Sequence, residues 1–573
     1  MLNPSSQANF LKNIFNINKL KEGMTYYQCT GEKYLREIPD FDKYTPEVLE
    51  RKIKKIIKKR YVFYGYQTFA NITEKMEDLS PKIFEKKIRE QFSDCVFIID
   101  EVHNIKEGDD LKVLPPKLEK VFKSTENMKL LLLSATPMYD TSNEIIFLMN
   151  LMLNNDGKPT MIEDDYFDRK GYFKGDIKKE DDKITKKFLQ TTRGYVSFVR
   201  GKNPLTFPEA IYPEDKVIKQ SDFPINDKDG VEIDESERIK ELKIISCPMD
   251  NDGLQRKVYE NSETDKTFGA FNQPALMCSN IVFPKLDEEE EFENFNLDKY
   301  VGDAGLSSIV SKSKIDKNLK YSFKNKAFEN AFKLEILKKY SSKIYNIIKN
   351  INQSKGIVFI YSQFIGSGII PLALALEIEG YKKMGSSLLS RKYESQKTKG
   401  NYIIISGNND LSKNAYRDYI KLESQNKNGE KVKIIIGSRT AAEGLDFKYI
   451  REIHILDPWF HYNRIEQIIG RGIRNCSHID LPSKDRNVKI FLYASTKSKI
   501  PKNDNETIDL KMYRISEVKT KQMAKIEYLL KKNSVDCNLN RDYNIFDNDK
   551  ENSRECNYNE CNYKCLPDNL LEL

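Results

Sequence analysis

Short runs of aliphatic residues, each ending at a small, polar or acidic residue, occur in two regions of the chain. The first region has such runs at residues 95–99 and 129–133, and the second has four of them, at residues 356–360, 402–405, 432–436 and 452–456. Helical patterns follow these runs. Continuous aliphatic runs are typical of strands that are buried in a parallel sheet. The pattern therefore predicts an α/β fold with two parallel sheets, whose functional loops follow the carboxyl ends of the strands.

Residues 154–339 separate the two regions and differ from both. They carry lysine-rich and acidic runs, such as residues 178–183 and 287–291, which predict an inserted α+β module with disordered edges. For the acidic run, a solvated linker is the alternative. Residues 192–208 alternate aromatic and β-branched residues with basic ones, so we expect a strand or hairpin there that packs on the first α/β unit. After residue 496 the chain becomes helical and then rich in Asn and Cys.

The composition is that of a globular protein. The 573 residues are 39% hydrophobic and 31% charged, which is enough chain and enough core for several domains. Lys and Arg number 94 against 86 Asp and Glu, and the net charge of 94 − 86 = +8 allows a locally basic groove without requiring one. The longest nearly uncharged apolar stretch, residues 369–376, is too short to cross a membrane, and residues 1–19 lack the pattern of a secretory signal. We therefore expect a protein that is neither secreted nor membrane-bound, in a reducing compartment where its nine cysteines are free or metal-bound rather than bridged.

Two adjacent carboxylates end the first predicted strand, in the segment VFIIDEVHN. Such a pair suits nucleotide hydrolysis, because one carboxylate can hold Mg²⁺ through its water shell while the other orients and deprotonates the attacking water. Asp100 is the candidate metal-side acid, Glu101 the candidate base, and His103 a candidate link toward the second domain. Taken alone, the pair has a helix N-cap or a surface turn as its alternative interpretation.

Three further segments suit the same chemistry. LLLLSATPM puts the hydroxyl groups of Ser134 and Thr136 at the end of the second predicted strand, where they can relay contact to the neighbouring domain. GSRTAAEGLDF, residues 437–447, follows another strand with a Gly-Leu-Asp that can approach a phosphate or a ribose closely. QIIGRGIR places Arg471 and Arg474 three residues apart on one helical face. Two such guanidinium groups suit the transition state of phosphoryl transfer, whereas a surface helix with ion pairs is the alternative.

The order of these segments resembles a known family. DEVH, SAT, GSRTAAEGLD and QIIGRGIR are similar to motifs II, III, V and VI of superfamily 2 helicases and translocases, and YVFYGYQTF, residues 61–69, resembles a strand of their motif Ib region. Within the superfamily, HILDPWFHYNRIEQIIGRGIRNCSH and GYVSFVRGKNPLTFP resemble the poxvirus nucleoside triphosphatase I and early-transcription-factor small-subunit group and the related DExH helicases of nucleocytoplasmic large DNA viruses. The resemblance covers most of residues 25–500.

The resemblance implies two RecA-like lobes, with ATP in the cleft between them and nucleic acid across their top. It divides the chain into a partial first lobe at residues 1–153, an inserted module at 154–339, a second lobe at 340–500 and a helical, Cys-rich tail at 501–573. It implies ATP and Mg²⁺ as cofactors and the backbone of DNA or RNA as the partner, with no membrane involved.

The resemblance also assigns roles to individual residues. It makes Asp100 and Glu101 the pair that holds Mg²⁺ and activates water, and it turns Gln467, Arg471 and Arg474 toward the nucleotide from the second lobe. The further nucleotide contacts that it implies are His103, Gly444, Asp446 and Gly470. The residues that it implies for coupling or for nucleic-acid contact are Ser134, Thr136, Thr440 and Tyr361.

The phosphate-binding loop of the family, G-x-x-x-x-G-K-[ST], does not occur in the sequence. In the family this loop precedes the motif Ib region, so we expect the first lobe to be incomplete. Either the reading frame is truncated or split and the rest of the lobe lies on another chain, or the protein has lost ATP turnover and persists as a binding subunit. The presence of both the acids and the arginines favours the first explanation. We expect little or no ATPase activity from this chain alone.

These observations predict an ATP-dependent helicase or translocase of a large DNA virus that acts in viral transcription. Its expected location is the virion or the host cytoplasm, in the viral factory. Its expected partners include viral RNA polymerase or the missing N-terminal half on another chain. A catalytically inactive, helicase-like binding subunit of a viral transcription complex is the alternative. A nuclease or restriction-type subunit is a third class, but the sequence offers no further carboxylate cluster for it.

Two more segments could bind an ion or nucleic acid. Cys556, Cys561 and Cys565, with Cys537 upstream, could form a structural Zn²⁺ site, and free thiols in the tail are the alternative. Residues 54–60 place basic side chains around a predicted amphipathic helix, which could touch phosphates or could form a solvated helix face. Contacts to the nucleic-acid backbone should weaken steeply as the salt concentration rises.

Overall fold

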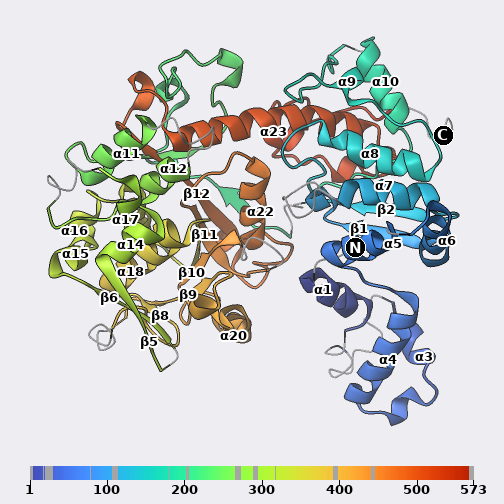
Figure 1. Cartoon of the computed structure of the whole chain (residues 1–573), viewed down its shortest axis with the longest axis horizontal. Coiled ribbons are helices and arrows are strands. Elements are labelled where there is room, and N and C mark those ends of the chain that lie inside the picture. The colour runs from blue at the N-terminus through green and yellow to red at the C-terminus, as the bar shows by residue number, and fades with distance from the viewer. Residues whose placement is uncertain are drawn as a thin grey trace. The chain divides into compact units, whose positions relative to one another are not determined.

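The computed structural model describes most of the chain (Figure 1), namely residues 4–16, 19, 30–77, 79–105, 114–179, 181–201, 206–264, 273–287, 295–316, 318–390, 398–439 and 445–566. The chain divides into two compact units. Unit 1 consists of residues 1–197, 525–537 and 565–573, and unit 2 consists of residues 198–524 and 538–564.

Unit 1 begins with a small helical layer that has a hydrophobic core of its own. The layer contains α1 (Pro4–Ile14), α3 (Lys33–Arg36) and α4 (Pro46–Arg60). Leu49, Ile53 and Ile57 lie on one face of α4 because they are spaced four residues apart, and they pack with Tyr34 and Leu35.

The rest of unit 1 is an α/β layer around two parallel strands, β1 (Val96–Asp100) and β2 (Lys129–Leu133). Its helices and 3-10 turn are α5 (Tyr66–Glu77), α6 (Pro81–Phe92), η3 (Val102–Ile105), α7 (Leu114–Ser124), α8 (Glu144–Asn155), α9 (Glu163–Tyr166) and α10 (Lys183–Thr192). One face of the sheet is covered, because the ring of Phe97 packs edge-on against Phe69 of α5, Phe92 of α6 and Phe122 of α7. On the opposite face Val96, Leu131 and Leu133 remain 63%, 45% and 41% exposed.

Unit 2 is built on a parallel sheet of eight strands, in the order β3-β12-β11-β7-β10-β9-β8 with β4 also paired to β12. The strands are β3 (Glu209–Ile211), β4 (Ile244–Pro248), β7 (Ile357–Tyr361), β8 (Lys382–Lys383), β9 (Asn401–Ile405), β10 (Ile434–Gly437), β11 (Ile450–Ile455) and β12 (Asn487–Thr496). A separate antiparallel hairpin pairs β5 (Val310–Ile315) with β6 (Asn318–Phe323).

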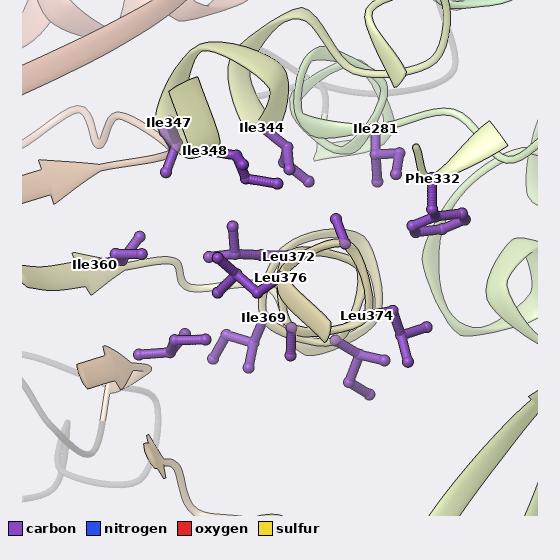
Figure 2. Close-up of a cluster of buried hydrophobic side chains, with 14 of the residues drawn as sticks. Ile281, Phe332, Ile344, Ile347, Ile348, Ile360, Ile369, Leu372, Leu374 and Leu376 are labelled. Carbon is purple, nitrogen blue, oxygen red and sulfur yellow. The ribbon is translucent and has the colours of Figure 1, made fainter. Parts of the chain in front are cut away.

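Both faces of this large sheet are buried. Val358 and Ile360 of β7 point into a cluster with α17 (Ser342–Ile351) and α18 (Ile370–Ile378), part of which is shown in Figure 2. The alternate residues Ile357 and Phe359 pack instead with α22 (Tyr462–Gly472). The other α-helices of unit 2 are α11 (Leu254–Thr264), α12 (Gln273–Asn280), α14 (Gly302–Ile309), α15 (Lys326–Ala331), α16 (Leu334–Leu337), α19 (Asn409–Ser412) and α20 (Ala415–Leu422). Two later helices, α23 (Ile508–Lys532) and α24 (Cys537–Asn540), contribute residues to both units.

The structure confirms the predicted α/β class, and each of the six predicted strands is present to within two residues. The division into four domains remains a prediction. The structure assigns residues 154–197 to unit 1 and residues 198–339 to unit 2, where β3 and β4 join the large sheet. The acidic run at residues 287–291 lies outside the described residues except for Asp287.

Two local predictions are wrong. Residues 61–69 do not form a strand: they have no regular structure up to Gly65 and then begin α5, where Phe69 is fully buried among aromatic rings. Tertiary burial thus overrides the β propensity of the aromatic segment. Residues 192–208 form no hairpin among the described residues 192–201 and 206–208, because their polar groups bind the C-terminal segment instead: Val196 accepts a hydrogen bond from the amide of Val535 at 2.8 Å. In the described part of the chain, no helix is long and apolar enough to span a bilayer.

Candidate functional site

The two carboxylates of unit 1 stand at the carboxyl end of β1. Asp100 is the last residue of the strand, and Glu101 follows it with a positive φ of 52°, which turns the chain sharply into η3. The hydroxyl of Tyr66 in α5 donates to the backbone carbonyl oxygens of both residues, at 3.1 Å for Glu101. Burial and the nearby carboxylates raise the pKa of Tyr66, so the hydroxyl keeps its proton and remains a donor at neutral pH.

His103 joins the Asp-Glu turn to the end of β2. Its Nδ1 lies 2.9 Å from Oγ of Ser134 and 3.5 Å from Oγ1 of Thr136, and its ring stacks on Tyr139. Burial lowers the pKa of His103 to about 4, so the imidazole is neutral at pH 7. Its approach to the Glu101 carboxylate, at 3.6 Å, is therefore a polar contact rather than an ion pair at that pH. Four of the predicted site residues of unit 1 thus form one connected cluster beside Asp100.

Asp100 has the chemistry expected of a Mg²⁺ ligand. Its carboxylate is half-buried and takes part in none of the ion pairs formed within the described part of the chain. Those described residues also contain no cluster of three or more acidic, His or Cys side chains that could hold a metal. Mg²⁺ needs no such cluster, because it usually binds one or two carboxylates together with water and substrate phosphates. A half-buried carboxylate at a strand end suits this mode of Mg²⁺ binding.

In unit 2, helix α22 carries the predicted motif VI residues. Ile465, Ile468 and Ile469 are buried in the sheet core, whereas Gln467, Gly470 and Arg471 lie on the half-exposed side of the helix. The helix approaches β11 closely at its C-terminal end, because a Cβ at Gly472 would lie 3.1 Å from atoms of Ile450 and Ile453.

The two arginines do not share a helical face as the sequence predicted. Helix α22 ends at Gly472, Ile473 has a non-helical conformation, and Arg474 lies beyond it. Gly472 is the last helical residue and does not have the positive φ of a glycine that ends a helix, so the sequence held no clear signal for this end. Arg471 and Arg474 nevertheless meet the same neighbouring segment, which is the predicted motif V.

Motif V and motif VI are held together within unit 2. Arg474 forms an ion pair with Asp446 at 2.8 Å, and Nη1 of Arg471 donates to the carbonyl oxygen of Leu445 at 3.3 Å. The amide of Phe447 donates to the carbonyl oxygen of Arg471 at 3.2 Å. The structure therefore brings together three of the predicted residues. Thr440 and Gly444 lie outside the described residues.

The last predicted residue, Tyr361, lies at the buried end of β7. Its hydroxyl accepts a hydrogen bond from Nη2 of Arg464 at 2.9 Å, and burial raises the pKa of Tyr361 to about 12. The guanidinium of Arg464 in turn stacks over Trp459 at 4.3 Å. Asp457, which sequence reasoning missed, is buried beside them and accepts hydrogen bonds from the Ser362 hydroxyl and other groups, so it fixes the loop that follows Tyr361. Asp457 could have been found from the sequence, because it is an acidic residue that directly follows a predicted buried strand.

Comparison with known proteins places this arrangement in a family. Residues 18–139 match the model of the type III restriction enzyme res subunit, and residues 342–476 match that of the helicase conserved C-terminal domain. The chain is 29% identical to putative helicase 087L of Invertebrate iridescent virus 3 over 98% of this chain and 49% of that protein. It is 27% identical to putative ATP-dependent RNA helicase R563 of Acanthamoeba polyphaga mimivirus, over 86% of this chain and 74% of that protein. It is 25% identical to a termination factor NPH-I homolog of African swine fever virus, over 78% of this chain and 63% of that protein.

The chain is thus a relative of the helicases of large DNA viruses. The chain spans about half the length of several curated relatives that it matches, 49% of the iridescent virus protein and 53% of putative ATP-dependent RNA helicase L377 of the mimivirus.

The C-terminal segment of the chain contacts the arginine-bearing helix, which the sequence did not predict. Within unit 2, Nη2 of Arg554 lies 2.7 Å from Oε2 of Glu466, and its Nε donates to Oε1 of Glu466 at 3.0 Å. The guanidinium also stacks over the ring of Tyr462 at 4.1 Å. Glu466 directly precedes Gln467, so this bidentate contact fixes the middle of α22.

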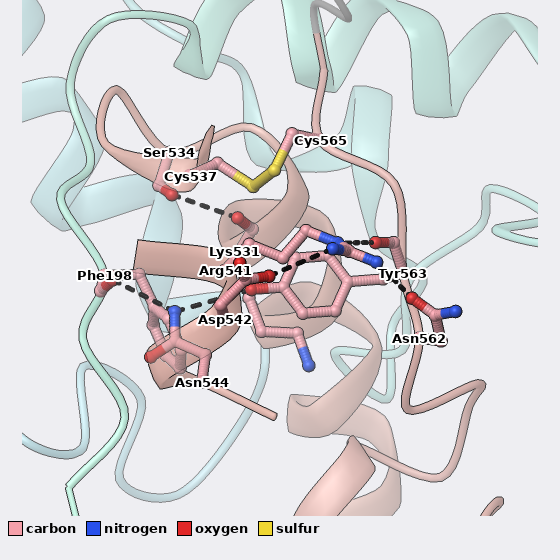
Figure 3. Close-up of a disulfide and its surroundings, with 10 residues drawn as sticks. All are labelled: Phe198, Lys531, Ser534, Cys537, Arg541, Asp542, Asn544, Asn562, Tyr563 and Cys565. Atoms are coloured by element: carbon pink, nitrogen blue, oxygen red, sulfur yellow. Dashed lines mark hydrogen bonds and ion pairs between the residues drawn. A yellow bond between two sulfur atoms is a disulfide. The ribbon is translucent and has the colours of Figure 1, made fainter. Parts of the chain in front are cut away.

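The predicted zinc site is wrong. The structure joins Cys537 to Cys565 and Cys556 to Cys561 in two disulfides, the first of which is shown in Figure 3. Zinc binds thiolates, and a sulfur that is bonded to another sulfur is no longer a thiolate. The expectation that all nine cysteines are unbridged is therefore also wrong for these four, whereas Cys95, Cys247, Cys278 and Cys476 are free.

Proposed function

We propose that this chain carries the ATP-hydrolysing acids and arginines of a viral DExH helicase or translocase of superfamily 2, which moves along nucleic acid during viral transcription. The observation that carries the proposal is the contact of His103 with Ser134, because it links the DEVH turn to the SAT segment in the way that coupling hydrolysis to movement requires. The viral relatives named above support the helicase part of this proposal.

In the proposed reaction, the acids of unit 1 act on the metal and on water. Asp100 would hold Mg²⁺ through its water shell, where the ion would neutralise charge on the phosphates. Glu101 accepts a proton from the water that attacks the γ-phosphorus, and the bond to the leaving diphosphate oxygen breaks. The positive φ of Glu101 and the two hydrogen bonds from Tyr66 fix the backbone from which the Glu101 side chain extends. His103 lies at the same end of the strand, and its contacts with Ser134 and Thr136 couple the conformation of the Asp-Glu turn to these two residues.

In unit 2 we assign the arginines to the charge that grows on the γ-phosphate oxygens. Arg471 and Arg474 bind these oxygens, and Gln467 lies one helical turn before Arg471. The ion pair of Arg474 with the exposed Asp446 holds the guanidinium until a phosphate competes for it. Gly444, Asp446 and Gly470 are proposed to line the nucleotide, and Thr440 and Tyr361 to contact nucleic acid or relay its binding.

We further propose that the phosphate loop comes from polypeptide that is not among these 573 residues. No G-x-x-x-x-G-K-[ST] segment occurs in the sequence. The exposed aliphatic side chains on one face of the β1–β2 sheet support this proposal, because parallel sheets are normally covered on both faces. The division into four domains, the contact with viral RNA polymerase and the location in the virion or the viral factory are parts of the same proposal.

A catalytically inactive, helicase-like binding subunit of a transcription complex is the second candidate, and the missing phosphate loop favours it. The coding sequence on either side of this chain distinguishes the two functions. A phosphate loop in the same frame or in a neighbouring gene supports the motor. If none is present, and the protein purified from infected cells does not hydrolyse ATP with either DNA or RNA, the binding subunit is the function.

A further inference from the structure

Helix α4 of unit 1 carries a large excess of positive charge. Its 15 residues contain seven Lys and Arg and two Glu, a net charge of 7 − 2 = +5. The whole chain of 573 residues has a net charge of +8. More than half of the charge excess is therefore carried by one four-turn helix that contains none of the helicase motifs.

The basic side chains cover the solvent-facing side of the helix. Leu49, Ile53 and Ile57 are buried on one face, and Arg51, Lys55 and Lys58, spaced by four and three residues, lie on the opposite face. The seven basic residues, which are all exposed, are Arg51, Lys52, Lys54, Lys55, Lys58, Lys59 and Arg60.

Few of these charges are neutralised within the protein. Lys54 pairs with Glu50 at 2.7 Å, and Arg60 pairs with Glu37 at 2.7 Å. None of the ion pairs formed among the described residues includes the remaining five, and Lys52 instead lies over the ring of Tyr44 at 4.5 Å. A helix with several uncompensated like charges on one face is expected to bind a polyanion.

We propose that the exposed face of α4 binds the sugar–phosphate backbone of the nucleic acid on which this helicase acts, as a contact surface separate from the motifs. The inference rests on the proposed function for the identity of the polyanion. The distance from Arg51 to Lys59 is about 12 Å along the helix axis, which matches about three to four nucleotides at about 3.4 Å each. Side chains of this kind contact phosphates and do not select a base sequence.

The packing of α4 favours nucleic acid over a membrane. A basic amphipathic helix that binds a membrane inserts its apolar face into the lipid. The apolar face of α4 is already buried, because Ile53 and Ile57 pack with Tyr34 and Leu35 in the core of the helical layer. Only the charged face is left for a partner.

The test measures binding of the full chain to fluorescently labelled single-stranded DNA, single-stranded RNA and duplex DNA of equal length over a range of salt concentrations. The variant carries Arg51→Ala, Lys55→Ala, Lys58→Ala and Lys59→Ala, all of which are exposed positions where Ala favours the helix. The matched control carries Lys82→Ala, Lys86→Ala, Lys87→Ala and Lys123→Ala, which remove the same charge from exposed positions of α6 and α7.

We expect the α4 variant to bind at least about tenfold more weakly at low salt, with the control close to wild type. The plot of log affinity against log salt should become shallower by about 3.6 for duplex DNA and about 2.8 for single strands, because each phosphate that the variant no longer neutralises changes the slope by about 0.9 or about 0.7. The nucleic acid for which the α4 variant loses the most affinity relative to wild type is identified as the partner. If the fourfold variant does not melt like wild type, the pair Lys55→Gln and Lys58→Gln replaces it, with about half the change in slope.

Three results would overturn the inference. The first is an α4 variant that binds like wild type, and the second is a control whose affinity falls as much as that of the α4 variant. The third is wild-type binding to phosphatidylserine vesicles that disappears in the α4 variant while nucleic-acid binding is unchanged. If the wild-type chain binds none of the nucleic acids, the proposed function fails as well, whereas normal wild-type binding with an unaffected variant rejects only the role of α4.

Discussion

The two parallel sheets of this protein arise from the same kind of sequence but reach different degrees of burial. In unit 2, every residue of β7 is buried, because helices cover both faces of the sheet. In unit 1, β1 and β2 are covered on one face by α5, α6 and α7, while Val96 and Leu131 stay exposed on the other. An apolar run therefore predicts a strand, but the number of helices that the chain packs against it decides how much of that strand is buried. The proposed catalytic acids stand at the end of a strand of the half-covered sheet, whereas the proposed arginines lie on and just after α22, a helix that covers the other sheet.

The largest expected effect comes from the buried ion pair of unit 2. Lys343 and Asp509 are 0% exposed and lie 2.8 Å apart, and Asp509 also accepts a hydrogen bond from the amide of Ser495. We expect Lys343→Met to lower the free energy of unfolding by about 3–5 kcal/mol, because it leaves a buried carboxylate without its counter-charge. Lys86→Met, which breaks the exposed pair with Glu90 in unit 1, should change it by less than about 1 kcal/mol. Denaturant unfolding followed by circular dichroism measures both, and equal effects would contradict the difference in burial.

Matched leucines in the two sheets give the next largest difference. Leu492 in β12 is fully buried, and its replacement by Ala should destabilise the protein by about 2–5 kcal/mol, because it reduces apolar burial and opens a cavity. Leu131→Ala in β2 removes a side chain that is 45% exposed, so we expect less than about half of that destabilisation. Amide hydrogen exchange of the two strands separates the effects. A Leu131→Ala variant as destabilised as Leu492→Ala would mean that the open face is covered in solution.

The two sheets should also respond separately to acid. Burial lowers the pKa of His103 in unit 1 and of His478 in unit 2 to about 4, below the ordinary value of 6.5. Protonation therefore favours the unfolded state: the stabilisation is complete above about pH 6.5 and disappears as the pH falls toward 4, by up to about 3 kcal/mol for each residue. Hydrogen exchange of each unit between pH 6.5 and 4 measures this dependence. His103→Gln should flatten it in unit 1 alone and His478→Gln in unit 2 alone, and a variant that leaves its own unit's pH dependence unchanged would contradict the assignment.

The smallest expected effect concerns helix α22. Arg554→Met removes the bidentate pair with Glu466 and the contact with the Tyr462 ring, and we expect a decrease in stability of about 1–2 kcal/mol. Amide protection of α22 reports it. The double variant Arg554→Glu with Glu466→Arg should recover part of this stability, because it restores opposite charges. No recovery would show that the pair does not hold the helix.

The sequence predicted the elements of this fold better than their contacts. Apolar runs located six of the twelve strands among the described residues but missed the others, including β12, and the contact of His103 with Ser134 was not predicted. The hydrogen bonds from Tyr66 and the ion pair of Arg554 with Glu466 join residues that are distant in sequence, so no local pattern could reveal them. Residues 61–69 show the opposite failure, in which a local propensity for strands was overridden by burial of Phe69. Disulfide pairing of the tail cysteines likewise depends on tertiary proximity, which their spacing does not specify.

The most direct test of the account is the rate of ATP hydrolysis by the purified 573-residue chain with Mg²⁺ and either DNA or RNA, compared with that of its Glu101→Gln variant. The account predicts two equal rates at the background level, because the carboxylates and arginines are present but nothing in the chain cradles the phosphates. Hydrolysis at an ordinary helicase rate that Glu101→Gln abolishes would contradict it, since the chain would then bind the triphosphate without the missing loop.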